Sequence, residues 1–301
     1  SPANYLWTLQ SLYGVTRDFR LLECLPEGAV GQSASRIYPF LGQLAQITNL
    51  LQEEATLDRL SAQLRPLHDR ATSDVDKRGL RLLEFVVEHR AAAQAHGAGP
   101  HVEKALAALK AAWRGTWAEH EPELLAGFLA GQGALVPALA GEQLRQLREL
   151  FNGAAKQSGD RLTIGAYYAS GLWANGRRAP AADVLGSALE EFRQAHEGLL
   201  PASANGHLQT LGIYREGLNE YRAAEQLWLS ELARRHPEGQ IQHLTQQLYQ
   251  HYQRALSARA EVSLGKGEAL YRALYAKLLA ELKRPTNEGQ MIQFVQTLVN
   301  V

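Results

Sequence analysis

The chain has 301 residues, of which 46% are hydrophobic, so it can bury a sizeable core. Its 31 Lys and Arg residues balance 31 Asp and Glu residues, and this zero net charge argues against a binder of nucleic-acid backbone, which needs surplus positive charge. No apolar run reaches the about 18–20 residues that a membrane helix needs, and the single cysteine, Cys24, cannot form an internal disulfide.

The chain begins with Ser1 and its only methionine is Met291, so we expect a trimmed or processed N-terminus. A cytoplasmic location is the default expectation, because one cysteine gives no sign of an oxidising compartment. Secretion or a periplasmic location stays open, since a leader would already have been removed. We expect Cys24 itself to be a small buried residue.

Helix-forming residues dominate and no alternation of apolar and polar residues marks a strand, so the sequence predicts an all-α fold. Pro66 should kink or shorten the helix that contains it. Ser73 is the expected N-cap of the following helix, and the glycines and proline of 96–100 should end it. In the first half of the chain, apolar residues recur at helical spacing over 3–13, 16–25, 36–52, 56–71, 101–118 and 122–130.

We predict three regions. Residues 1–130 form a helical domain of degenerate repeats or of compact shape. Residues 131–159 form a connector, with the glycines Gly131 and Gly133 and a short helix at 142–152. Residues 160–301 form helical repeats, and Asp160 is available to cap the first helix. Beyond the repeats, helices are predicted at 239–261, after Gly265–Gly267, and at 287–301.

Two copies of one pattern lie between Asp160 and Pro237. Their matching positions are 43 residues apart, since Ala181 corresponds to Ala224 and Leu185 to Trp228. Small residues allow two helices to cross closely, and the large residue four positions later fills the space beside them. Gly176 and Asn219 fall at the expected turns, where these residue types tolerate left-handed backbone angles. The full pattern comprises Tyr168, Ala169, Leu172, Gly176, Ala181, Leu185, Ala188 and Leu189, then Leu211, Gly212, Asn219, Tyr221, Ala224, Trp228 and Leu232.

This pattern resembles the tetratricopeptide repeat, a helical hairpin that stacks into an α-solenoid. The resemblance covers 160–237, about a quarter of the chain. It departs from the family in its spacing of 43 rather than 34 residues, in Arg215 where an aromatic is usual, and in Glu231 where a small residue is usual. Two ordinary amphipathic helix pairs are the alternative. The resemblance implies an α-solenoid of antiparallel hairpins, irregular in its N-terminal half.

In such a solenoid the first helix of each hairpin lines the concave surface. The family's carboxylate-gripping mode uses asparagine with lysine or arginine on this face, and those types are missing here, so an aromatic and polar groove for a peptide segment fits better. The alternative is that Tyr167 and Trp173 are core residues. The implied binding residues are Tyr167, Ser170 and Trp173 from the first copy and Gln209, Thr210, Ile213 and Glu216 from the second.

The titratable residues give no catalytic or metal-binding pattern. The cluster of Glu119, His120, Glu121 and Glu123 is expected to be surface charge, because neighbours on a helix point in different directions. His243 and His251 are expected to be solvent-exposed. Tyrosines such as Tyr252 should line the rim of the core with a hydrated hydroxyl. No metal, cofactor or catalytic residue is predicted.

The sequence therefore predicts a non-catalytic scaffold that binds a protein, a peptide or another region of its own full-length chain, with no nucleic-acid or membrane partner. A ligand-sensing regulatory domain and an all-helical enzyme are the alternatives. The apolar residues Leu298, Val299 and Val301 also predict that the last helix docks on a missing segment or forms a homo-oligomer.

Overall fold

The computed structural model describes residues 2–24, 54–97, 99–113, 117, 121–131, 136–234 and 238–262. Helices dominate these residues and none of them belongs to a β-strand, which confirms the all-α prediction. The helices predicted at 36–52, after Gly265–Gly267 and at 287–301 lie outside this part of the chain, as do His120 and Pro237. The oligomer contact predicted for the last helix lies outside it too.

The chain divides into two compact units. Unit 1 comprises Ser1–Ala155 and Thr163–Arg177, and unit 2 comprises Lys156–Leu162 and Arg178–Val301. Helix α8 contributes to both units. The region predicted as a connector, 131–159, holds a full helix that packs within unit 1.

Unit 1 contains most of the N-terminal helices. They are α1 (Pro2–Thr16), the 3-10 helix η1 (Phe19–Cys24), α3 (Glu54–Arg70), α4 (Asp74–Gln94), α5 (Pro100–Ala112), α6 (Glu121–Gly131), α7 (Pro137–Gly153) and the greater part of α8 (Gly159–Ala174). Helix α3 runs past Pro66 for one further turn, so the proline does not end it. The helix predicted at 142–152 begins earlier, because Pro137 fits its first turn.

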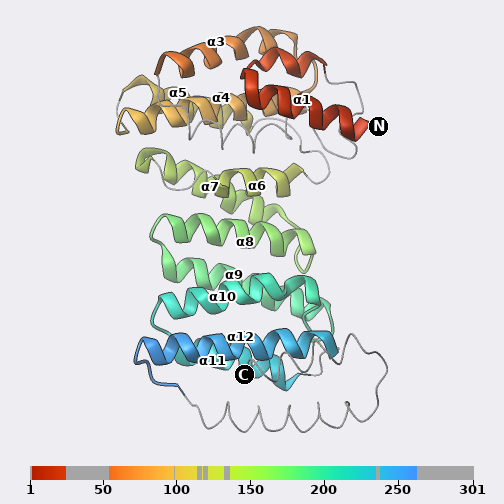
Figure 1. Cartoon of the computed structure of the whole chain (residues 1–301), viewed down its shortest axis with the longest axis vertical. Coiled ribbons are helices and arrows are strands. Elements are labelled where there is room, and N and C mark those ends of the chain that lie inside the picture. The colour runs from red at the N-terminus through yellow and green to blue at the C-terminus, as the bar shows by residue number, and fades with distance from the viewer. Residues whose placement is uncertain are drawn as a thin grey trace. The chain divides into compact units, whose positions relative to one another are not determined.

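Helix α4 is central to unit 1 because it packs against both α3 and α5 (Figure 1). Ser73 caps it as predicted, since its hydroxyl accepts a hydrogen bond from the Asp76 amide at 3.0 Å. At the other end Gly97 adopts a φ of 77° and its amide donates to the Ala92 carbonyl at 2.7 Å. Twelve residues of α4 are buried, as expected for a helix with neighbours on two sides.

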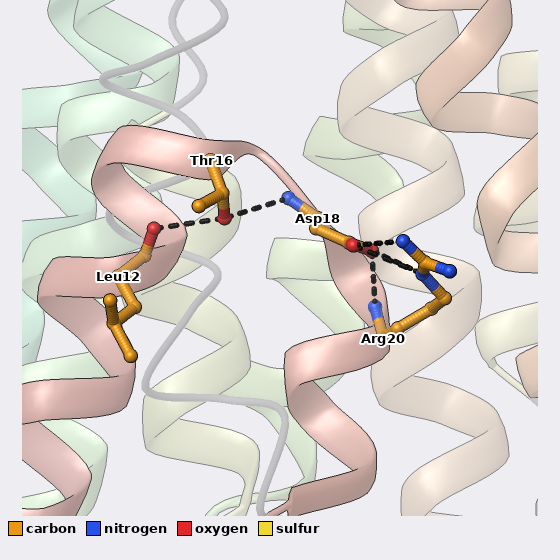
Figure 2. Close-up of polar contacts among 4 residues, drawn as sticks. All are labelled: Leu12, Thr16, Asp18 and Arg20. Carbon is orange, nitrogen blue, oxygen red and sulfur yellow. Dashed lines mark hydrogen bonds and ion pairs between the residues drawn. The ribbon is translucent and has the colours of Figure 1, made fainter.

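The end of α1 is fixed by short-range polar contacts, which Figure 2 shows. The Thr16 hydroxyl donates to the Leu12 carbonyl at 2.9 Å. Asp18 accepts a bond from the Arg20 amide at 3.0 Å and also binds the Arg20 guanidinium, with Nη2 2.6 Å from Oδ2. Asp18 therefore caps η1. The buried rings of Tyr13 and Phe19 lie 5.4 Å apart and join η1 to α1.

Unit 2 contains α9 (Arg178–Ala195), the 3-10 helix η2 (Ala202–Ala204), α10 (Asn205–Gly217), α11 (Tyr221–Ala233) and α12 (Glu238–Ser257). Helix α10 packs against α9 and α11, and α11 packs against α12 (Figure 1). The amide of Arg161 donates to the Ser158 hydroxyl at 3.1 Å, so Ser158 rather than Asp160 caps the first turn of α8.

The turn after α8 and the turn after α10 have the same backbone geometry. Gly176 and Asn219, 43 residues apart, both adopt positive φ, 75° and 62°, as predicted. The amides of Arg177 and Glu220 each donate to the carbonyl five residues earlier at 2.9 Å, which is the bond of a Schellman motif. The offset of 43 extends to the helix bounds, because Ala174 and Gly217 end the first helices while Arg178 and Tyr221 begin the second.

The small and large positions of the pattern are buried as predicted. Ala181, Leu185, Ala224 and Trp228 are each at most 1% exposed. In the second copy the reason is visible. A Cβ atom on Gly212 would lie 2.5 Å from Cζ2 of Trp228, so only glycine lets the indole of α11 lie against the backbone of α10.

Candidate functional site

The three predicted binding residues of α8 lie in unit 1. Tyr167 and Trp173 are half-buried and Ser170 is exposed. The ring of Tyr167 covers Gly127 of α6, where an added Cβ would approach the ring within 3.1 Å. Part of Tyr167 therefore serves packing within unit 1, which is the core alternative that the sequence left open.

The four predicted residues of α10 lie in unit 2 and have different surroundings. Gln209 and Thr210 are half-buried, Ile213 is 47% exposed, and Glu216 is buried. At the 43-residue offset Tyr167 corresponds to Thr210 and Ser170 to Ile213. Tyr167 and Thr210 are both half-buried, and Ser170 and Ile213 are both exposed. Trp173 is half-buried, whereas its counterpart Glu216 is buried.

We define the α10 stripe as the open side of α10, formed by Gly206, Gln209, Thr210, Ile213 and Gly217. These positions recur at three- and four-residue intervals, so they lie along one side of the helix. None of the side chains carries a charge. The Thr210 hydroxyl donates to the Gly206 carbonyl at 2.9 Å, which leaves Ile213 as the large apolar group of the stripe.

Buried contacts hold the opposite sides of α10. Leu208, Leu211 and Tyr214 are buried, and Gly212 lies against Trp228 of α11. A Cβ on Gly186 of α9 would make an ordinary 3.8 Å contact with Leu211. The stripe is therefore presented by a helix that packs on two neighbours.

Glu216 fastens α12 to α10 through an ion-pair cluster. Its Oε2 lies 2.5 Å from Nε of Arg254, and its Oε1 lies 2.7 Å from Nδ1 of His251. Burial opposes ionisation of Glu216, but the bonds from His251 and Arg254 outweigh it and lower the pKa of its carboxyl group. Because both oxygens are engaged within unit 2, Glu216 serves to position α10, and we leave it out of the stripe.

A second polar contact fastens α12 to α11. The hydroxyl of Tyr252 donates to the Glu225 carboxylate at 2.9 Å. Burial, and then the adjacent Glu225 carboxylate, raise the pKa of the Tyr252 phenol above its usual value. Tyr252 is half-buried, in agreement with its predicted position at the rim of the core, and its hydroxyl has the Glu225 carboxylate as a hydrogen-bond partner.

Glu231 explains one departure from the repeat pattern. It is 1% exposed and forms ion pairs with Arg193 of α9 and Arg234. Arg193 also pairs with Glu190. A carboxylate takes the position of a small residue here because an arginine of another helix reaches it.

Two buried polar clusters in unit 1 also surround α4. Arg78 lies 2.5 Å from the Glu121 carboxylate, donates to the Ala112 carbonyl at 2.9 Å, and lies 4.4 Å from the ring centroid of Trp117. Glu88 accepts from the Ser61 hydroxyl at 3.0 Å and lies 2.7 Å from Nδ1 of His101. These clusters join α4 to α3, α5 and α6.

The structure overturns three predictions about exposure. Glu121 is completely buried against Arg78, whereas surface charge was expected. His251 is also completely buried, whereas exposure to solvent was expected. Cys24 is exposed rather than buried. Glu121 could not be recognised from local sequence, because its partner lies 43 residues earlier in the chain.

The burial of His251 did leave a signal in the sequence. The buried positions of α12 include Leu244, Leu248, His251 and Ala255, whose intervals of four, three and four residues follow the helical period. Within the helix predicted at 239–261, the apolar residues Leu244, Leu248 and Leu256 instead follow one another in multiples of four, and Leu256 is 58% exposed. The helical period is 3.6 residues, so positions at a constant spacing of four rotate by about 40° per step and do not include His251.

The buried clusters have the geometry of structural contacts. In a nucleophilic triad the histidine lies between the serine and the carboxylate. In unit 1 the carboxylate of Glu88 lies between Ser61 and His101, so the histidine is not the group bonded to the serine. In unit 2 His251 has no exposed surface through which a substrate would reach it.

The described residues contain no group of three or more histidine, cysteine or acidic side chains placed to hold a metal ion. Nor does any helix among them combine the length and apolar character needed to cross a membrane.

Comparisons with known proteins give no relatives: no protein-family model, curated protein or solved structure matches the chain. Function must therefore be inferred from the helices and surfaces described above.

Proposed function

We propose that the chain is a non-catalytic helical scaffold that binds a peptide or a segment of another protein, and that the α10 stripe is its binding face in unit 2. The observation that carries this proposal is the 47% exposure of Ile213 at the centre of an uncharged stripe. Apolar groups on a fixed helix face are the anchors by which helical proteins bind a second helix or an extended segment.

The surroundings of the stripe favour an uncharged ligand segment. The nearest basic group on α10, Arg215, lies 2.7 Å from the Glu220 carboxylate and 3.5 Å from that of Asp183. Its charge is therefore balanced by its neighbours. Gly206 and Gly217 at the ends of the stripe carry no side chain, so the backbone of a ligand can approach α10 closely.

The same proposal includes a repeat architecture of the tetratricopeptide kind for 160–237. Its support is the pair of turns at Gly176 and Asn219, which share positive φ and the same hydrogen bonds at an offset of 43 residues. Successive packing of α9, α10, α11 and α12 is also what a stacked array of helices requires.

A peptide library displayed on phage tests the binding function and needs no candidate partner. Selection on the intact chain should enrich peptides with apolar residues at helical or alternating spacing. An Ile213→Asp variant should bind the enriched peptides at least about ten-fold more weakly, because it places a charge in the contact.

Leu256→Asp is the matched control, since Leu256 is also an exposed apolar residue of unit 2 but lies on α12. This variant should bind the peptides like the wild-type chain. Equal binding by Ile213→Asp and the wild type would exclude the stripe as the site. Failure to enrich any peptide would count against the binding function itself.

A further inference from the structure

The turn that ends α12 has the same backbone geometry as the turn that ends α10. Arg259 adopts a φ of 53°, and its amide donates to the Leu256 carbonyl at 3.0 Å. The next amide, that of Ala260, donates to the carbonyl five residues earlier at 2.9 Å, which is again the bond of a Schellman motif. Arg259 therefore corresponds to Asn219, and the two turns define the register in which α12 can be compared with α10.

In this register α12 repeats the exposure pattern of the α10 stripe. Leu208 and Leu211 of α10 correspond to Leu248 and His251 of α12, and all of these are buried. The positions of the α10 stripe correspond to positions of α12 that are exposed or half-buried in the same order. We call them the α12 stripe, formed by Gln246, Tyr249, Gln250, Gln253 and Ser257.

Helix α12 runs parallel to α10, because α11 is antiparallel to both. A tight turn at Asn219 joins α10 to α11. The start of α11 contacts the end of α12, since Arg222 lies 2.5 Å from the Glu261 carboxylate and Glu225 accepts a hydrogen bond from Tyr252.

The two stripes lie side by side within unit 2. The Glu216 carboxylate of α10 binds His251 and Arg254 of α12. At about 100° per residue, Glu216 falls beside Gln209 at one edge of the α10 stripe, whereas Arg254 falls beside Gln250 at the opposite edge of the α12 stripe. Two parallel helices that touch through these edges present their stripes on the same side.

The α12 stripe differs from the α10 stripe in its chemistry. Gln246, Gln250 and Gln253 each end in a carboxamide, and no side chain of the stripe carries a charge. A carboxamide has N–H donors and a carbonyl acceptor, which are the hydrogen-bonding groups of a peptide bond. Gln253 donates to the Tyr249 hydroxyl at 2.8 Å, so the carbonyl of this amide and the proton of the hydroxyl are directed to other partners.

These carboxamides distinguish a helical ligand from an extended one. A helix bonds its backbone N–H and C=O groups internally, so it has few to offer to glutamines. An extended segment has these groups unpaired. At about 3.3 Å per residue, three of its residues match the distance of about 10 Å along α12 from Gln246 to Gln253.

We infer that the two stripes form one face that binds an extended, uncharged peptide segment. Ile213 packs against an apolar side chain of the segment, and the glutamines of the α12 stripe bind its backbone. Leu256 lies outside this face, at the edge of α12 that is turned away from α10. The inference rests on the proposed function, and it adds the conformation of the ligand and a second helix that contacts it.

The test uses peptides that are selected on the intact chain and bind more weakly to Ile213→Asp. Gln246→Leu, Gln250→Leu and Gln253→Leu should each weaken their binding by about three- to ten-fold, because each variant removes hydrogen bonds to the ligand backbone. Leucine and glutamine have similar helix propensities, so α12 should be retained. Gln226→Leu is the matched control, because Gln226 is an exposed glutamine of α11, and it should bind like the wild type.

Methylation of single backbone amides of the peptide tests which ligand atoms are bound. Methylating an amide that bonds to a glutamine should weaken binding to the wild type by at least about three-fold. The loss should be smaller in the variant that lacks this glutamine.

Two results would overturn the inference and leave the proposed function standing. In the first, peptides that depend on Ile213 bind all three glutamine variants like the wild type. In the second, every methylation weakens binding equally in the wild type and in the three variants, as expected for a helical ligand whose backbone α12 does not contact. Failure to enrich any peptide would overturn the proposed function together with this inference.

Discussion

Among the described glycines of unit 2, Gly212 has the closest side-chain neighbour, Trp228, with only 2.5 Å between an ideal Cβ at position 212 and Cζ2 of the indole. The indole belongs to a fully buried side chain, so it has little room to move. The contact fixes the spacing between α10 and α11 and therefore the position of the α10 stripe.

Gly212→Ala should destabilise the chain by about 1–3 kcal/mol, because the methyl group overpacks the contact with Trp228. Denaturant unfolding followed by circular dichroism measures the loss. Gly186→Ala is the control in α9. Its Cβ would make an ordinary 3.8 Å contact with Leu211, so it should be neutral or stabilise by up to about 1 kcal/mol.

A double-mutant cycle would show that the indole is the cause. With Phe at position 228, Gly212→Ala should cost less than it does in the wild type, because the smaller ring leaves space for the methyl group. Equal costs in the two backgrounds would mean that the loss arises elsewhere in α10.

Glu121→Gln should destabilise unit 1 by about 3 kcal/mol, because it leaves the guanidinium of Arg78 buried without its counter-charge. Both side chains are at most 1% exposed. Unfolding by urea, followed by the fluorescence of the neighbouring tryptophans, measures the change.

The control for this prediction is Glu149→Gln, which removes the exposed partner of Arg145. That change should cost less than about 1 kcal/mol, since solvent screens exposed ion pairs. Replacing Arg78 by Met together with Glu121 by Leu should recover most of the stability lost in Glu121→Gln. A single variant as stable as the wild type would show that the pair contributes no net stability.

The stability of unit 1 should fall as the pH is lowered, because of His89. This side chain is completely buried and its ring stacks on Phe85 at 5.4 Å. Burial, and then the charge of Arg90, lower the pKa of His89 from 6.5 to about 4. A lowered pKa means that the folded state favours the neutral ring. The stability is therefore complete above pH 6.5 and is lost as the pH falls toward 4.

Between pH 7.5 and pH 5.0 this linkage predicts a loss of roughly 2 kcal/mol. His89→Phe keeps a ring beside Phe85 but cannot titrate, so the slope of stability against pH should decrease. His207 belongs to unit 2 and burial lowers its pKa as well, so it should give unit 2 a slope of the same sign, which His207→Gln should remove. An unchanged slope in His89→Phe would contradict the assignment. Measurements stop at pH 5. At lower pH the folded chain would also lose the stability that comes from the lowered pKa values of Glu84 and Glu216.

Local rules in the sequence predicted the turns and caps well. Gly176, Asn219 and Ser73 occupy the predicted positions because a left-handed turn and a helix N-terminus each impose a requirement on a single residue. The burial of the small and large positions of the repeat could also be predicted, since the helical period places them on one face.

Pairings between distant helices could not be predicted in this way. Glu121 and His251 are buried only because Arg78 and Glu216, each at least 35 residues away, meet them in space. The candidate site also combines a residue chosen from the local pattern with a residue whose role depends on a distant helix. Ile213 was proposed because the resemblance to a repeat places it on the concave side of its helix, and it is exposed. The role of Glu216 depends instead on α12, which lies two helices further along the chain.

The two matching turns, at Gly176 and Asn219, have the same backbone structure but carry side chains with different roles. Gly176 and Asn219 donate their amides to the carbonyls of Trp173 and Glu216 through bonds of 3.0 and 2.8 Å. At this shared backbone position one copy presents a half-buried indole and the other a carboxylate that anchors α12. The same main-chain module therefore tolerates unrelated side chains at its last turn, which makes position 173 the natural place to graft a new anchor onto this scaffold by design.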